Sequence, residues 1–164
     1  MSGALTLRDA VPGDEALVAR FVRALAEYEN LQHELRGTAA DFACALFGPG
    51  PRAWALFAEI DRQPVGFAVW FYTFSTFAAR PGLYVEDVFV QPEQRGRGIG
   101  RMIFRDLARR ALAEGCARME WQVLNWNAPA IGFYRSIGAL PVDDWTVQRL
   151  NGAALHAFAA VDPT

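Results

Sequence analysis

A strand, a glycine-rich turn and a helix follow one another between Leu83 and Arg105, and this segment constrains the fold most. The strand-like stretch Leu83–Val90 is rich in β-branched and aromatic residues, and a helical pattern begins near Ile99. Between them, a turn of this kind directs backbone N–H groups at a bound anion, and the helix dipole adds a favourable potential. Glycines allow close approach of the anion, and arginine side chains bond phosphate oxygens bidentately. The residues concerned are Arg95, Gly96, Arg97, Gly98, Ile99, Gly100 and Arg101. The segment therefore predicts a site for a pyrophosphate.

Three phosphate-binding motifs compete for this turn. A P-loop requires a lysine, and the sequence contains no lysine at all. A dinucleotide-binding fingerprint requires a third glycine at position 101, where Arg101 stands. The pattern that fits is Gln/Arg-x-x-Gly-x-Gly/Ala, which the sequence meets from Arg95 to Gly100. An arginine- and glycine-rich surface turn without a ligand is the alternative reading of the motif taken alone.

Composition narrows the class of protein. The 164 residues are 52% hydrophobic, which favours one globular domain spanning 1–164. The net charge of −2 and the absence of basic blocks exclude a nucleic-acid partner. No secretory signal and no apolar run long enough to span a membrane are visible, so we expect a cytoplasmic protein without a membrane partner. The two cysteines and two histidines lack ligand spacing, so we expect no metal site.

Hydrophobic periodicity predicts the order of the elements. Helices are expected from Asp14 to about Asn30, and over 39–47, 99–113, 127–137 and 152–160. Strands are expected over 5–8, 53–60, 65–73, 84–90, 119–124 and 145–150. Only the unit around the glycine-rich turn has the strand–helix–strand form of a parallel pair. The prediction is an α/β fold with a mixed, mostly antiparallel sheet of about six or seven strands flanked by helices.

The motifs taken together resemble the GNAT N-acetyltransferases, and in particular the diamine and polyamine (spermidine/spermine-type) acetyltransferases. The resemblance is carried by Arg95–Gly100 and by segments spread over nearly the whole chain. These segments are 25–29, 66–73, 84–90, 126–134 and 143–145. It implies the acyl-CoA N-acyltransferase fold, acetyl-CoA as cosubstrate, a small-molecule amine as acceptor and a homodimer.

The resemblance also implies roles for individual residues. Glu86 corresponds to the general base that deprotonates the amine, and Tyr134 to the general acid that protonates the leaving CoA thiolate. Backbone N–H groups near the end of the central strand would polarise the thioester carbonyl. The expected cofactor-binding residues are Val88, Phe89, Val90, Arg95, Gly96, Arg97, Gly98, Ile99, Gly100, Arg101, Asn127, Ala130 and Tyr134. Asn127 is equally suited to be a helix N-cap.

Carboxylates and aromatic rings indicate the acceptor site. A cationic amine needs negative charge and accepts aromatic faces. The expected substrate-binding residues are Tyr28, Glu29, Glu86, Asp143 and Trp145. Asp87 ranks below Glu86, because strand alternation sends consecutive side chains to opposite faces unless a bulge intervenes.

The identity of the acceptor stays open at this stage. The sequence departs from the resemblance near Phe77–Pro81 and near Trp145. The leading hypothesis is acetylation of a diamine, a polyamine or a lysine-like amino acid. The alternatives are acetylation of protein N-termini or side chains, acetylation of an aminoglycoside, and a non-catalytic acyl-CoA-binding module.

Overall fold

The computed structural model describes residues 3–160, which fall into two compact units. The first unit extends to Leu124 and the second begins at Asn125. Each unit is described by itself below. The single-domain organisation expected from the length stays a prediction.

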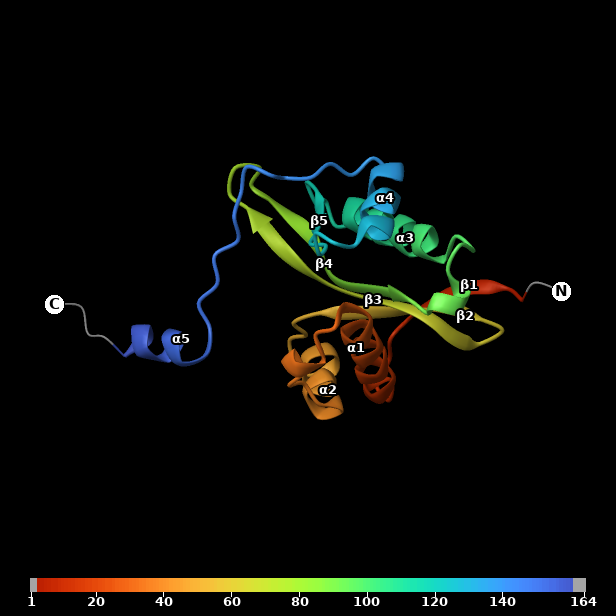
Figure 1. Ribbon diagram of the computed structural model, residues 1–164, viewed down its shortest axis with the longest axis horizontal. Helices are drawn as coiled ribbons and strands as arrows, with labels where there is room; N and C mark the ends of the chain where they lie inside the picture. Colours follow the sequence, from red (N-terminus) through yellow and green to blue (C-terminus); the bar gives the residue numbers. More distant parts are fainter. Residues whose placement is uncertain (1–2, 161–164) are drawn as a thin grey trace. The chain divides into compact units, whose positions relative to one another are not determined.

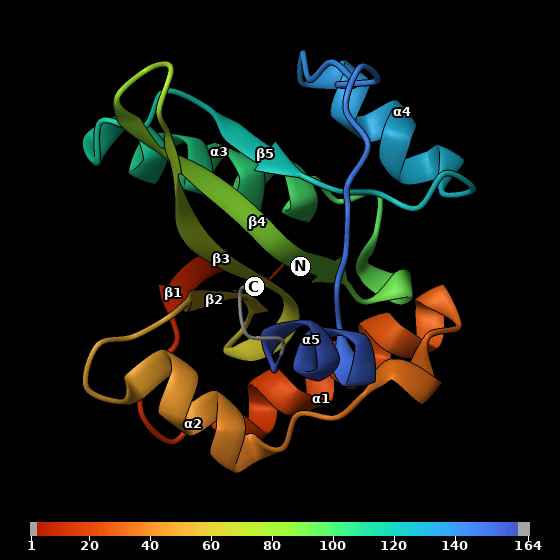
Figure 2. The same ribbon diagram turned by 90° about the vertical axis from the view of Figure 1, so that its left-hand side faces the viewer.

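A five-stranded sheet forms the centre of the first unit (Figure 1). The strands lie in sequence order, and all neighbours are antiparallel except β4 and β5, which are parallel. They are β1 (Leu5–Asp9), β2 (Trp54–Ile60), β3 (Gln63–Ser75), β4 (Arg80–Val90) and β5 (Met119–Trp121). The mixed, mostly antiparallel α/β architecture is thus confirmed, and Figure 2 shows β3 and β4 as a long hairpin.

Helices cover both faces of this sheet. Helices α1 (Glu15–Glu29) and α2 (Ala39–Phe47) lie on one face, and α3 (Ile99–Ala113) lies on the other (Figure 1). Two short 3-10 helices, η1 (Gln32–Glu34) and η2 (Pro92–Gln94), interrupt the loops. The expected N-cap of α2 is confirmed, because Thr38 and Asp41 form a reciprocal capping box.

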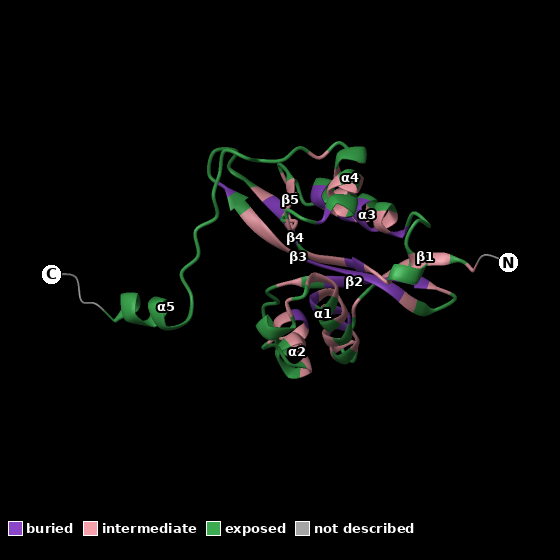
Figure 3. Ribbon diagram, in the orientation of Figure 1, coloured by how far each residue is buried: buried purple, intermediate pink, exposed green. Residues whose placement is uncertain are grey.

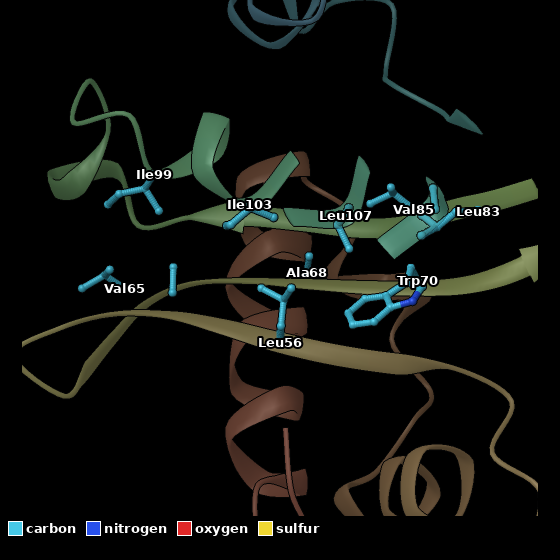
Figure 4. Close-up of a cluster of buried hydrophobic side chains, with 11 residues drawn as sticks. Leu56, Val65, Ala68, Trp70, Leu83, Val85, Ile99, Ile103 and Leu107 are labelled. Carbon is cyan, nitrogen blue, oxygen red and sulfur yellow. The ribbon is translucent and has the colours of Figure 1, made fainter. Parts of the chain in front are cut away.

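The sheet separates two hydrophobic cores, and its central strands are buried (Figure 3). On the α3 side, Ile99, Ile103 and Leu107 pack over the sheet with at most 1% of each residue exposed (Figure 4). On the α1 side, Phe21 stacks on Phe67 with the ring centroids 5.2 Å apart. Because Ile99 is the first residue of α3, the α3-side core also fixes where the glycine-rich turn ends.

The second unit contains α4 (Ala128–Ser136) and α5 (Gly152–Ala159), joined by an irregular segment. The strand expected over 145–150 is wrong: no strand forms there, and residues 143–150 are exposed. The described residues therefore form five strands rather than six or seven. The physical reason is that a strand needs a neighbour to satisfy its backbone groups, and the periodic sequence alone does not supply one.

Candidate active site

The glycine-rich turn adopts the conformation that its glycines permit. Gly96 and Gly98 have φ of +76° and +79°, values that a side chain rarely allows. Gly98 is the N-cap of α3, and the first helical N–H bond runs from Met102 to the Gly98 carbonyl at 3.0 Å. The N–H groups that precede Met102 lie in the first turn, where a helix offers its donors and its positive dipole end to an anion. The turn therefore has the geometry expected of a phosphate site.

The predicted phosphate-binding arginines all lie exposed at this turn, and two are already oriented by neighbours. Arg95 donates its Nε–H to the Val90 carbonyl at 3.0 Å. Arg97 donates to the side-chain oxygen of Gln94. Arg101 lies in the first turn of α3. Three guanidinium groups thus border the turn on the protein's surface.

The end of β4 leaves one side of the strand without a partner strand. Strand β5 pairs only with Leu83, Tyr84 and Val85. On the other side, β3 continues to pair with β4 as far as Val90. Among the described residues no strand pairs with 86–90 on the β5 side, so no strand covers this edge of β4, although the Val90 carbonyl there accepts the Arg95 Nε–H.

A β-bulge occurs at Glu86. Val69 pairs with Asp87 and the next residue of β3, Trp70, pairs with Val85, so Glu86 has no partner in β3. The bulge reverses the alternation of side chains. Val85 belongs to the core on the α3 side, whereas Phe89 belongs to the core on the α1 side.

The bulge brings two consecutive carboxylates to one face of the sheet. Asp87 lies opposite Val69, which packs in the α1-side core, so Asp87 shares that face. The negative charges of Glu86 and Glu29 both act on Asp87. The bulge therefore removes the alternation argument that ranked Asp87 below Glu86, and the participation of Asp87 in a site becomes a proposal. The available signal was a pair of acidic residues within an otherwise apolar strand.

Burial favours the protonated form of two of these carboxyl groups, Asp87 and Glu29. Burial raises the pKa of Asp87 to about 6, and the charges of Glu86 and Glu29 add to the effect. Burial also raises the pKa of Glu29, at the end of α1. Tyr84 shares this face, and its pKa is raised by burial and by the charges of Glu86 and Glu120. A cationic ligand would lower the electrostatic cost of ionising Asp87 and Glu29.

The remaining predicted residues belong to the second unit. Asn127 is buried, and its side-chain oxygen accepts the Ala130 N–H at 3.3 Å, which confirms the N-cap reading. Tyr134 lies on α4, partly buried, with its ring centroid 5.5 Å from that of Phe133. Asp143 and Trp145 are exposed in the segment between α4 and α5. Their participation in the site stays a prediction.

The sequence profile of the acetyltransferase (GNAT) family matches residues 18–139. This range contains both the glycine-rich turn and the bulged strand described above. The chain belongs to the GNAT acetyltransferase family. It is therefore an acetyltransferase, and the family uses acetyl-CoA as cosubstrate.

Other GNAT acetyltransferases are similar over most of the chain. Thialysine N-epsilon-acetyltransferase of Bos taurus is 34% identical, over 93% of this chain and 96% of its own length. L-ornithine N5-acetyltransferase of Arabidopsis thaliana is 27% identical, over 93% of this chain and 86% of its own length. Among solved structures, an integron cassette protein from the mobile metagenome of V. cholerae matches with a TM-score of 0.79 and 25% identity, over 98% of this chain and 99% of that one. The expected fold is thus confirmed.

A metal site and a membrane-spanning helix were both expected to be absent, and the structure bears on them only for the residues that it describes. Within 3–160, no three His, Cys, Asp or Glu side chains gather closely enough to hold a metal ion. No helix in the same range is both long and apolar enough to cross a membrane. The absence of a metal, the absence of a nucleic-acid partner and the cytoplasmic location stay predictions from the sequence.

Proposed function

We propose that this GNAT enzyme transfers the acetyl group of acetyl-CoA directly to a primary amine of a small cationic acceptor. The acceptor class is a diamine, a polyamine or a lysine-like amino acid. The observation that carries the proposal is the cluster of Glu29, Glu86 and Asp87 on one face of the sheet, formed by the bulge in β4. The curated relatives named above act on thialysine and L-ornithine, which supports an acceptor with a terminal amine.

In this proposal, the chemistry of each group follows from its charge. An aliphatic ammonium has a pKa near 10.4 and must lose a proton before it attacks the thioester. Glu86, exposed at the bulge, accepts that proton directly or through a water molecule. Glu29 and Asp87 add negative charge that attracts the acceptor. Tyr134 protonates the departing CoA thiolate.

The acetyl donor would lie along the open side of β4. Backbone N–H groups near Val88–Val90 would stabilise the thioester oxyanion, because preorganised donors act strongly on developing charge. The turn at Arg95–Arg101 would hold the pyrophosphate, since it combines glycines of positive φ with exposed guanidinium groups. Asn127 and Ala130 complete the predicted cofactor set.

A thiol-release assay with acetyl-CoA and a panel of acceptors tests the proposal. The panel contains 1,3-diaminopropane, spermidine, lysine, ornithine, thialysine, an aminoglycoside and a peptide with a free N-terminus. We expect the small cationic amines to be acetylated, with kcat/KM falling as ionic strength rises. Efficient acetylation of the peptide or the aminoglycoside, with all small amines inert, would overturn the acceptor class. Binding of acetyl-CoA without turnover of any acceptor would support a non-catalytic module.

Two variants separate binding from chemistry in the same assay. Glu29→Gln should raise KM for the best amine more than it lowers kcat, because it removes ground-state attraction. Glu27→Gln is the matched control, since Glu27 is exposed on the same turn of α1. Glu86→Gln should instead lower kcat and flatten the alkaline dependence of the rate. An unchanged kcat in Glu86→Gln would remove Glu86 from the role of base.

A further inference from the structure

Tyr28 and Arg95 contact each other although they lie far apart in the sequence of the first unit. Tyr28 lies in the last turn of α1, and Arg95 opens the glycine-rich turn. The guanidinium carbon of Arg95 lies 4.4 Å from the centroid of the Tyr28 ring. This distance is that of a cation–π stack. The stack connects the helix on one face of the sheet to the turn that precedes α3.

Three contacts together restrain the Arg95 guanidinium. Its central carbon lies over the Tyr28 ring, and the Phe89 ring centroid lies 5.5 Å from the same carbon. Its Nε–H is bound to the Val90 carbonyl at 3.0 Å. A free arginine side chain samples many rotamers, so a guanidinium held by three contacts loses less entropy when it binds a ligand.

With Arg95 held in this way, its two terminal amino groups can donate hydrogen bonds to a ligand. In the part of the chain that the structure describes, Arg95 makes only the three contacts given above. Its two terminal amino groups therefore have no acceptor there. Paired N–H donors in a plane match the oxygens of a phosphate, whereas the face of the same group is suited to an aromatic ring.

We infer that Tyr28 is a positioning residue of the acetyl-CoA site, because its ring holds the Arg95 guanidinium ready to bind a pyrophosphate oxygen. This inference rests on the proposed use of the turn at Arg95–Arg101 for acetyl-CoA. It reassigns Tyr28, which the sequence had placed against the acceptor amine. An ammonium ion approaching the ring would meet a positive charge already stacked on it.

The last turn of α1 then serves both substrates. Tyr28 acts on the donor through Arg95. Glu29 acts on the acceptor through its negative charge, which also acts on Asp87. The positive charge of Arg95 attracts phosphate, and the negative charge of Glu29 attracts an ammonium ion. Of two adjacent residues of α1, one thus helps to bind the anionic donor and the other helps to bind the cationic acceptor.

Calorimetric titration with CoA tests the inference. Tyr28→Leu should raise the Kd for CoA about threefold, which is the range of an exposed cation–π contact. Tyr28→Phe should restore wild-type affinity, because it keeps the ring. Arg95→Gln should weaken CoA binding, and the double variant Tyr28→Leu/Arg95→Gln should bind no more weakly than Arg95→Gln alone. Arg95→Lys, which keeps the charge but loses the planar fork, should also weaken binding, and its exposed position leaves the fold intact.

An acetyl donor that lacks the pyrophosphate shows whether Tyr28 acts on pyrophosphate binding or on the stability of the fold in general. With acetyl-pantetheine as donor, Tyr28→Leu should leave the KM of the donor and of the amine unchanged. An unchanged Kd for CoA together with a raised KM for the amine would place the Tyr28 ring against the acceptor and overturn the inference. A wild-type protein that does not bind CoA would overturn the proposed function itself. If Tyr28→Leu does not fold, equal CoA affinity in Arg95→Lys and wild type overturns the inference by itself.

Discussion

At the scale of single residues, the bulge at Glu86 has the largest effect on the site. Without it, alternation would place Glu86 and Asp87 on opposite faces of β4. With it, Asp87 shares a face with Phe89 and feels the charges of Glu86 and Glu29. A bulge adds one residue to one strand only, and its position depends on the partner strand. The sequence of β4 alone therefore identifies both carboxylates but not their common face.

The raised pKa of Asp87 predicts a stability cost that depends on pH. Below about pH 4, Asp87 is protonated in both the folded and the unfolded chain, so it contributes nothing. Between pH 4 and 6 the unfolded chain ionises while the folded chain keeps its proton, so the free energy of unfolding falls as pH rises. Above pH 6 Asp87 is ionised in both states, and the free energy of unfolding stays lowered by the full amount. Asp87→Asn should therefore stabilise the protein at pH 8 by at most about 3 kcal/mol.

Thermal unfolding at pH 4 and pH 8 measures this effect. The Tm of Asp87→Asn should exceed that of the wild type at pH 8 and approach it at pH 4. Glu86→Gln is the control, because Glu86 is exposed at the bulge and should gain less from losing its charge. Equal Tm differences at both pH values for Asp87→Asn would show that its ionisation carries no such cost.

Removal of the Tyr134 hydroxyl is expected to change catalysis rather than stability. If its hydroxyl protonates the CoA thiolate, Tyr134→Phe should lower kcat by about 100-fold or more and leave acetyl-CoA affinity nearly unchanged. Steady-state kinetics and calorimetry with the same protein sample give both quantities. Tyr72→Phe removes a hydroxyl from β3, where the Tyr72 ring packs against Trp54, and serves as the matched control. An unchanged kcat in Tyr134→Phe would leave Tyr134 a packing residue of α4.

At the scale of elements, local signals predict helices well. The boundaries of α2 and α3 are those expected from Thr38, from the apolar stripe of α3 and from the glycines that follow. Helix signals are local because caps and i, i+4 contacts lie within a few residues. The expected strand over 145–150 is wrong for the opposite reason: its periodicity is local, but its hydrogen-bond partner is not. The short length of β5 has the same origin.

The turn before α3 makes a prediction about acetyl-CoA binding. Gly98→Asp should abolish binding, because it adds negative charge and bulk at the helix N-terminus where the phosphates approach. Calorimetry with acetyl-CoA measures the loss. Gly115→Asp is a matched control: Gly115 has φ of +69°, open space around its Cβ position and a place just beyond the other end of α3.

The comparison of these two glycine variants separates strain from electrostatics. Both place an aspartate in a left-handed conformation, so both carry a similar backbone cost. Only Gly98→Asp puts the carboxylate at the dipole's positive end, next to the predicted pyrophosphate. If the two variants bind acetyl-CoA equally well, the turn is not the donor site.

At the scale of the whole molecule, exposed apolar side chains indicate an interface. Phe74 and Phe77, at the tip of the β3–β4 hairpin, are 66% and 99% exposed. Strands β3 and β4, of 13 and 11 residues, are the longest strands of the described sheet, and the tip of their hairpin leaves both rings uncovered. Exposed apolar patches of this kind mark protein interfaces. Together with the resemblance to the diamine and polyamine acetyltransferases, they predict a homodimer.

Light scattering coupled to size-exclusion chromatography tests this prediction. We expect a species of twice the 18.1 kDa of the chain at micromolar concentration. The double variant Phe74→Asp/Phe77→Asp should shift the equilibrium toward the monomer, because it introduces two charges into the predicted apolar contact. Val11→Asp, at an apolar residue that is 55% exposed in the loop before α1, is the control and should stay dimeric. A wild-type mass of a single chain, with acetyl transfer intact, would show that the hairpin tip serves another purpose and that the active site is complete in one copy.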